Sequence, residues 1–129
     1  MSVLPFATYQ PVHRMNVGPR EDYAAVVLHT NGGKVPQDGS LFAWFSDLDG
    51  NGIPPAGVGA HFQVTWDGKI YQYLNTDRYC GHAWAANRWT VGIETEDAGE
   101  PSMRWTDRQI DSIVRPTNAT SSFTGDTTT

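Results

Sequence analysis

The spacing of apolar and polar side chains predicts three strands in the middle of the chain. Residues 24–30, with the sequence AAVVLHT, form a nearly continuous apolar run, which is typical of a strand buried on both faces. Residues 59–66 alternate between apolar and polar, and the Asp-Gly pair just after them is a strong hairpin signal. We therefore expect a return strand over residues 70–74 and a third strand over residues 90–95.

Two further segments show the pattern of amphipathic helices. Ser40 can cap a short helix over residues 41–47. Thr106 and Gln109 form a capping box that predicts the start of a second helix, and Pro116 is expected to end it. The apolar face of this second helix would consist of Ile110, Ile113 and Val114.

The composition along the chain indicates three parts: an N-terminal arm, one domain and a C-terminal tail. The length of 129 residues suits one domain with a single core. Residues 1–20 hold three prolines and no sustained periodicity, which indicates an arm laid over the domain. The domain itself would span residues 21–115. Residues 116–129 are rich in Thr and Ser, and this composition predicts a disordered tail.

Composition excludes several classes of partner. The net charge of −5 argues against nucleic acid, whose phosphates must be neutralised by Lys and Arg, and against a basic membrane-binding surface. No apolar run approaches the roughly 20 residues needed to cross a bilayer. Residues 1–9 lack the basic start and apolar core of a secretory signal. Because Cys80 is the single cysteine, no internal disulfide is possible.

His29 is the first candidate for chemistry, because it ends the predicted strand and precedes the turn-rich segment 31–39. An imidazole held at a strand end is a suitable first ligand for Zn²⁺. The alternative is a core histidine whose ring is satisfied by hydrogen bonds, and this alternative is favoured when His29 is considered alone. A zinc site of His29, Cys80 and His82 is conceivable, but spacing alone does not establish that these three side chains converge.

His61 and Glu94 lie within predicted strands. Alternation places His61 on the face opposite Phe62. Glu94 emerges from an apolar strand, where burial of a carboxylate is costly unless it has a partner. A partly desolvated carboxylate could act as a general base, whereas the alternative is an ordinary surface charge, since Glu96 follows closely.

An acidic segment after the first predicted helix resembles the start of a calcium-binding loop. Its acidic and amide positions are Asp47, Asp49 and Asn51. Such a loop needs a bidentate acidic ligand at its twelfth position, which is Val58 here. A polar turn leaving the short helix is therefore the favoured interpretation.

Several of these segments occur together in a recognisable order. They are VVLHT at 26–30, GAHFQVTWDGKIYQ at 59–72, GHAW at 81–84, Asn87, VGIE at 91–94 and the helix start at 106–109. In this order they resemble the zinc-dependent N-acetylmuramoyl-L-alanine amidases, a family that includes phage endolysins, recycling enzymes and peptidoglycan recognition proteins. The resemblance covers residues 24 to about 115.

The resemblance implies an α/β fold, a mixed central β-sheet flanked by helices, and hydrolysis of the amide between N-acetylmuramic acid and L-alanine in peptidoglycan. It makes His29 a zinc ligand and Glu94 the general base, and it assigns His61, His82 and Asn87 to the substrate groove. A monomeric phage endolysin is expected, present in the host cytoplasm and then at the cell wall. Without a secretory signal, such a protein would reach the wall through lysis of the producing cell.

Two departures from the family pattern bear on activity. This chain has Ala at position 60, where one phage branch of the family has a catalytic Tyr. The branch of the family that has Ala at this position also has the Glu that this chain has at position 94. After Pro116 there is no His, Cys or Lys, so the second and third zinc ligands of the family are not found. We therefore expect a truncated or frameshifted product. The alternatives to an active amidase are a non-catalytic peptidoglycan-binding module and an inactive fragment.

Overall fold

The computed structural model describes residues 3–21, 25–30, 40–96 and 104–123. A mixed sheet of five strands, in the order β1-β5-β4-β7-β3, forms its centre. These strands are β1 (Thr8–Tyr9), β3 (Ala25–Thr30), β4 (Phe62–Val64), β5 (Ile70–Gln72) and β7 (Thr90–Thr95). A separate pair joins β2 (Gly18–Pro19) to β6 (Arg78–Tyr79). The helical elements are η1 (His13–Met15), α1 (Phe42–Ser46), η2 (Trp84–Trp89) and α2 (Asp107–Phe123).

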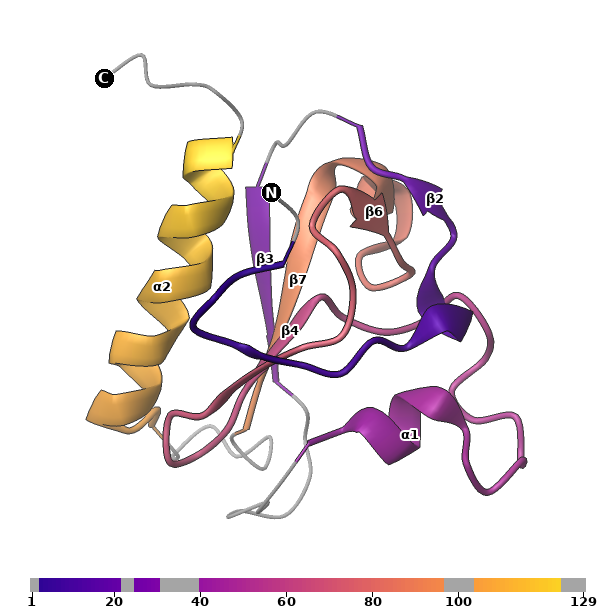
Figure 1. The fold of residues 1–129 in the computed structure, drawn as a ribbon, viewed down its shortest axis with the longest axis horizontal. Coiled ribbons are helices and arrows are strands. Elements are labelled where there is room, and N and C mark those ends of the chain that lie inside the picture. The colour runs from indigo at the N-terminus through magenta and orange to yellow at the C-terminus, as the bar shows by residue number, and fades with distance from the viewer. Residues whose placement is uncertain (1–2, 22–24, 31–39, 97–103, 124–129) are drawn as a thin grey trace.

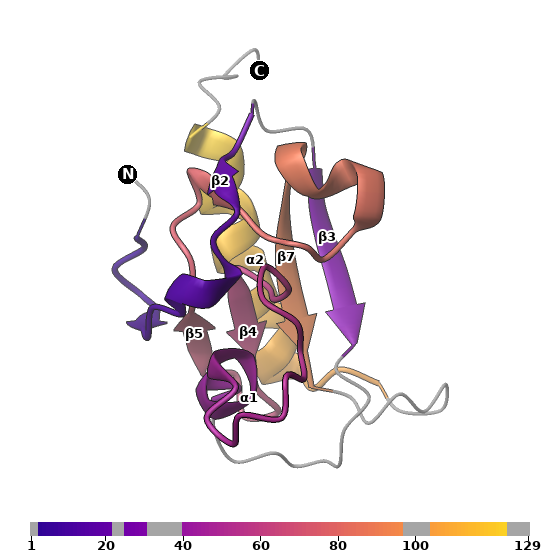
Figure 2. The ribbon, with the colours of Figure 1, turned by 90° about the vertical axis from the view of Figure 1, so that its right-hand side faces the viewer.

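The sheet confirms the predicted hairpin and third strand. β4 and β5 pair antiparallel on either side of a turn in which Gly68 has φ +88°. β7 runs parallel to both β4 and β3. Figure 2 shows β5, β4, β7 and β3 side by side, with α2 behind them and α1 in front. The α/β class expected from the resemblance is therefore correct.

The long helix α2 covers one face of the sheet (Figure 1). That face is apolar, and the buried cluster beneath the helix consists of Leu4, Phe62, Val64, Ile70, Val91, Ile93 and Ile113. The capping box at the start of α2 is confirmed: the Gln109 amide N–H donates to Thr106 Oγ1 at 3.1 Å, and the Thr106 N–H donates to Gln109 Oε1 at 2.9 Å. Of the predicted apolar face of α2, Ile113 is buried, whereas Ile110 and Val114 are half-exposed.

The prediction that Pro116 ends this helix was wrong. α2 continues through Pro116 to Phe123, so the predicted disordered tail is helical over residues 116–123, and residues 124–129 lie outside the described residues. Packing explains the continuation, because Pro116 is buried and Ala119 packs against the apolar cluster. In addition, Thr117 Oγ1 donates a hydrogen bond to the Ile113 carbonyl at 2.9 Å.

The prediction that the first strand is buried on both faces was also wrong. Within the described sheet β3 is an edge strand, and each of its residues is exposed or half-buried; Leu28 is 41% exposed. An apolar run specifies burial only when a neighbour covers each side, and β3 is paired only with β7 among the described strands.

The N-terminal arm is an integral part of the fold. β1 extends the sheet by pairing parallel with β5, and Leu4, Val12 and Met15 are buried. Val12 and Met15 join a second cluster on the face opposite α2, together with Phe45 from α1, Tyr73 and Cys80. Ala60, two residues before Phe62, also packs in this second cluster.

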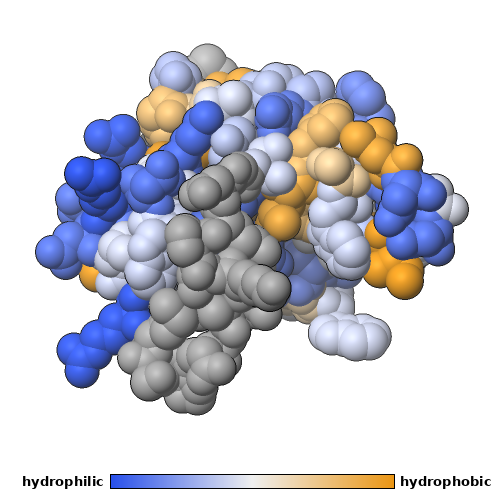
Figure 3. Space-filling view, turned by 90° about the horizontal axis from the view of Figure 1, so that it is seen from below, coloured by the Kyte–Doolittle hydropathy of each residue, from blue (hydrophilic) through white to orange (hydrophobic). Residues whose placement is uncertain are grey.

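Around α1, hydrophobic side chains reach the surface. Figure 3 views the molecule from this end and shows hydrophobic residues gathered at the right, where α1 and the following loop lie in Figure 1. Trp44, Leu48 and Ile53 are each at least half-exposed. In that loop, the Gly52 N–H donates to Asp47 and the Asn51 N–H donates to Asp49 Oδ1, which supports the polar-turn interpretation. None of the helices described is long and apolar enough to span a bilayer.

Candidate functional site

The polar face of the sheet aligns three functional side chains in one row. His29 on β3 is in register with Glu94 on β7, and Glu94 is in register with Gln63 on β4. Residues in register on neighbouring strands point to the same face. The five-stranded sheet therefore brings His29 and Glu94 together from positions 65 residues apart, which the sequence alone could not establish.

His82 lies directly against the backbone of β7. A Cβ atom on Gly92 would lie 2.7 Å from His82 Nδ1, so the glycine is required for this close approach. From there the ring reaches His29, whose Nε2 is 3.0 Å from His82 Nδ1. The two rings meet edge to face, with centroids 5.3 Å apart.

The hydrogen bonds around His82 determine which ring nitrogens carry protons. Thr90 Oγ1 donates to the Ala86 carbonyl at 2.7 Å, so its hydroxyl accepts the bond from His82 Nε2 at 3.1 Å. Nδ1 of the neutral His82 is then an acceptor, and His29 donates from Nε2. Nδ1 of His29 is left as the nitrogen with a lone pair.

Burial favours the uncharged form of these imidazoles. Desolvation is the largest cause that lowers the pKa of His82, to about 4, and the neighbouring His29 lowers it further. Desolvation also lowers the pKa of His29. Two neutral rings can share the hydrogen bond described above, whereas two charged rings would repel each other.

His61 lies in the interior and not in a groove. Its ring is fully buried, Nε2 donates to the Arg78 carbonyl at 2.8 Å, and Nδ1 accepts from the Gly92 N–H at 3.1 Å. Burial is the largest cause that lowers its pKa, to about 3. Nδ1 therefore binds β7 and Nε2 binds β6, so both nitrogens are used inside the fold and the expectation that His61 contacts substrate has no geometric support. Its ring does pack against His82, with centroids 5.8 Å apart.

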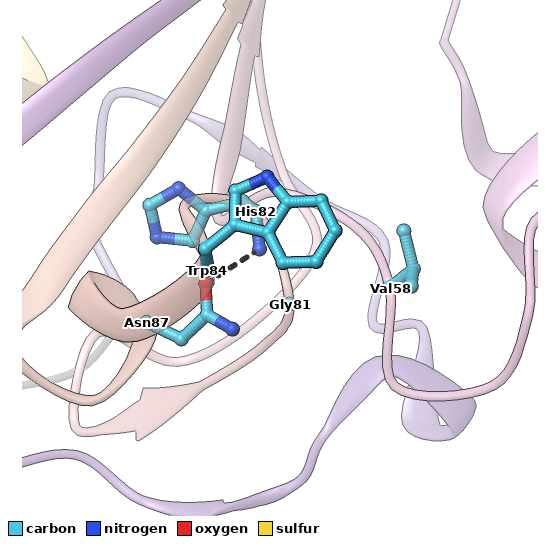
Figure 4. A pocket seen from close by; sticks show the side chains of 5 residues that line it. All are labelled: Val58, Gly81, His82, Trp84 and Asn87. Carbon is cyan, nitrogen blue, oxygen red and sulfur yellow. Dashed lines mark hydrogen bonds between the residues drawn. The ribbon is translucent and has the colours of Figure 1, made fainter.

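A pocket of about 370 Å³ opens beside His82. It is lined by Val58, Gly81, His82, Trp84 and Asn87, so two of the residues expected in the substrate groove do line a cavity (Figure 4). The Asn87 side chain is oriented by the backbone: Oδ1 accepts from the N–H groups of His82 at 2.9 Å and Ala83 at 2.6 Å. Nδ2 is consequently held as a donor beside the pocket.

The side chains that the structure describes do not fit a zinc ion. Among residues 3–21, 25–30, 40–96 and 104–123 no group of three His, Cys, Asp or Glu could hold a metal ion. Cys80 is fully buried, and desolvation together with the Glu94 charge raises its pKa to about 12, so it is a thiol. His82 Nδ1 also bonds to His29, so in this structure the conceivable set of His29, Cys80 and His82 is not arranged around a common metal position.

Sequence reasoning missed two contributors to the site. Thr90 fixes the ring of His82, and nothing in the sequence distinguishes it from other strand threonines. Trp84 is 94% exposed at the pocket and has φ +52°. Its place in the GHAW segment was a signal for proximity to His82, but backbone conformation is not visible in the sequence.

Comparisons with known proteins agree with this fold. A family model described as N-acetylmuramoyl-L-alanine amidase matches residues 19–122. A crystal structure of an AmpD derivative is 26% identical with a TM-score of 0.68, covering 91% of this chain and 74% of that one. No curated protein sequence matches the chain.

Two more distant structures share the fold. The endolysin N-acetylmuramoyl-L-alanine amidase LysCS from Clostridium intestinale is 18% identical with a TM-score of 0.72, covering 97% of this chain and 79% of that one. Peptidoglycan recognition protein-LE, solved with a monomeric diaminopimelic acid-type peptidoglycan, is 16% identical with a TM-score of 0.67, covering 88% of this chain and 72% of that one.

Proposed function

The chain belongs to the N-acetylmuramoyl-L-alanine amidase family, and from this premise we propose that it binds the junction between muramic acid and L-alanine in peptidoglycan. The observation that carries this proposal is the pocket beside His82, in which Asn87 presents a fixed amide donor. The junction contains an amide carbonyl, and a carbonyl oxygen is the acceptor that such a donor recognises.

The chemistry of the pocket supports a muropeptide as its ligand. Neutral His82 adds a polar wall, while Val58 and Trp84 supply apolar surface. Small-molecule sites commonly combine apolar walls with a few oriented polar groups. The net charge of −5 suits a ligand recognised by hydrogen bonds and stacking better than a polyanion. The relative solved with a monomeric peptidoglycan is consistent with this ligand class.

A pair of Asn87 variants tests this proposal. Asn87→Asp keeps an acceptor for the His82 and Ala83 N–H groups but replaces the donor by an oxygen. Asn87→Ala removes both functions. We expect Asn87→Asp to weaken binding of a soluble muramoyl-peptide at least tenfold, by calorimetric titration, while the melting temperature stays close to that of the unmodified chain. Unchanged muramoyl-peptide affinity in Asn87→Asp would contradict the proposal.

Hydrolysis of the same amide, as in a phage endolysin, is the second candidate function. The pairing of His29 with Glu94 across β3 and β7 favours it. The Glu94 carboxylate would take the proton from an attacking water, and His29 is the proposed zinc ligand of the family pattern.

Two measurements separate hydrolysis from binding alone. Release of stem peptides from purified cell walls should be absent without added zinc and, if the second candidate is right, present with it. Glu94→Gln should then abolish release at unchanged muramoyl-peptide affinity, because the amide is not a base. Lysis of bacteria by externally added protein would support the endolysin role. Binding without release under every metal condition would leave recognition as the function.

A further inference from the structure

Trp84 combines two properties that rarely occur together. Its side chain is 94% exposed, and its φ of +52° lies in the left-handed region. A bulky residue in this region is strained, and such strain persists only where the surrounding structure enforces it. Water also solvates an exposed indole poorly. The protein therefore holds a large apolar ring in solvent at a cost in both backbone and side-chain free energy.

The conformation of Trp84 is enforced from both sides. Before it, the N–H groups of His82 and Ala83 both donate to Asn87 Oδ1. After it, the Ala86 N–H donates to the Ala83 carbonyl at 3.0 Å, and the Thr90 hydroxyl binds the Ala86 carbonyl. The turn that presents the indole is thus tied to β7 at its far end, and Figure 4 shows the ring beside His82 and Asn87.

Other exposed tryptophans do not share these properties. Trp44 on α1 is 50% exposed and Trp89 at the end of η2 is 42% exposed. Among the non-glycine residues described, only Asp47 and Trp84 have positive φ. Neither Trp44 nor Trp89 lines the pocket. The presentation of Trp84 is therefore a feature of the pocket and not of a generally aromatic surface.

We infer that Trp84 is a stacking platform for the sugar ring of the ligand, so that the pocket recognises the glycan as well as the amide. This inference rests on the proposed function. A pyranose ring has a face of C–H groups that can lie on the negative face of an indole, while its hydroxyls stay in water. Because Trp84 is at the open side of the pocket, it can contact a ring that remains part of a glycan strand.

The alternative occupants fit less well. An anionic membrane surface is disfavoured by the net charge of −5. A purely apolar ligand would leave the Asn87 amide donor beside it without an acceptor, which costs free energy. A sugar linked to an amide satisfies both groups at once, because the ring covers the indole and the carbonyl accepts from Asn87.

The test compares two ligands on three proteins. The ligands are a disaccharide muramoyl-peptide and the free stem peptide of the same sequence, and the proteins are the unmodified chain, Trp84→Ala and Trp84→Phe. We expect Trp84→Ala to weaken binding of the muramoyl-peptide about tenfold, which corresponds to about 1.4 kcal/mol at 25 °C, and to leave free-peptide affinity unchanged. Trp84→Phe should retain most of the affinity, because it keeps an aromatic face.

Two further variants serve as controls. Trp44→Ala removes an exposed indole outside the pocket and should bind both ligands as the unmodified chain does. Trp84→Gly removes the ring and the backbone strain together, so it should match the binding loss of Trp84→Ala with an equal or higher melting temperature. A binding loss in Trp84→Gly at full stability would exclude misfolding as its cause.

The outcomes distinguish failure of this inference from failure of the proposed function. If the unmodified chain binds the muramoyl-peptide and Trp84→Ala binds it equally tightly, the platform is disproved and the proposed function stands. If Trp84→Ala loses affinity for both ligands in equal measure, glycan recognition is disproved as well. If the unmodified chain binds neither ligand nor intact peptidoglycan, the proposed function fails and the inference fails with it.

Discussion

The two faces of the central sheet are built from the same strands but are stabilised in different ways. On the face under α2, Phe62, Val64 and Ile93 are fully buried among other apolar side chains. On the opposite face, the same strands present His61, Gln63 and Glu94. Alternation along the central strands produces both faces, because successive side chains point to opposite sides of the sheet.

The polar face is buried too, but each group there needs a partner. Gln63 Oε1 accepts bonds from the Leu41 N–H and the Tyr73 hydroxyl, and both ring nitrogens of His61 are bonded. On the α2 face, burial itself supplies the stabilising free energy. Around His61 and Gln63 on the opposite face, hydrogen bonds mainly offset desolvation, so burial of these two side chains fixes geometry at a lower net gain.

Truncation of Phe62 should have the largest effect on stability. Removal of a fully buried aromatic side chain costs about 3–5 kcal/mol, a large part of the 5–15 kcal/mol typical of a domain. Leu28→Ala, on the same face but at the half-exposed edge strand, should cost less than about 1 kcal/mol. Urea unfolding of both variants measures the contrast. Equal losses would mean that the β3 edge is as well buried as the centre.

Acidification should destabilise the polar face through its buried histidines. The pKa of His61 is about 3 in the folded chain, against 6.5 for the unperturbed imidazole of the unfolded chain. The unfolded chain therefore takes up the proton first, and the stability contributed by neutral His61 is complete above pH 6.5 and is lost as pH falls towards 3. The free energy of unfolding should fall by about 1.4 kcal/mol per pH unit for this one proton.

His61→Gln provides the control for this pH dependence. It should be less stable than the unmodified chain at pH 7 but lose less stability between pH 6 and pH 5, because one titrating group is gone. His82, whose pKa is also lowered, adds to the slope in both proteins. Unfolding curves at several pH values give the two slopes. Identical slopes would show that His61 is not the group responsible.

Gly92→Ala should disturb the polar face without touching the apolar one. The added Cβ would meet the His82 ring at 2.7 Å and push it away from His29, and overpacking of this kind costs about 1–3 kcal/mol. Gly18→Ala is the matched control, since its Cβ would lie 3.4 Å from Tyr79 Cε1, an ordinary contact. The imidazole NMR signals of His29 and His82 should shift in the first variant only. Unshifted signals in Gly92→Ala would contradict the close approach.

Local patterns in the sequence were sufficient for much of the apolar face. The hairpin of β4 and β5, the strand β7 and the capping box of α2 all depend on residues close in sequence, and all were predicted. The burial of β3 and the continuation of α2 past Pro116 were not, because both depend on which distant elements pack against them.

The site was predictable as a set of residues but not as an arrangement. His29, Glu94, His82 and Asn87 were selected through their segments, and the structure brings them together around β7. Their roles remain predictions. The proton positions on His82 depend on a hydroxyl from Thr90, and the exposure of Trp84 depends on a backbone conformation. Neither feature could be predicted from the sequence, because no periodic pattern of residues indicates the contacts on which it depends.

The smallest effect we predict concerns the N-cap of α2. The Thr106 hydroxyl accepts from the Gln109 N–H and donates to the Trp66 carbonyl, and Gln109 Nε2 donates to the carbonyl of Glu96, just after β7. Thr106→Ala should cost about 1 kcal/mol, as is usual for loss of an N-cap. Ser40→Ala, whose hydroxyl accepts a longer bond of 3.3 Å at the short helix α1, should cost only a few tenths of a kcal/mol. Because the Thr106 hydroxyl also binds the Trp66 carbonyl after β4, its loss should shift the melting temperature without changing muramoyl-peptide affinity. A fall in muramoyl-peptide affinity for Thr106→Ala would instead mean that the packing of α2 on the apolar face also positions the polar site.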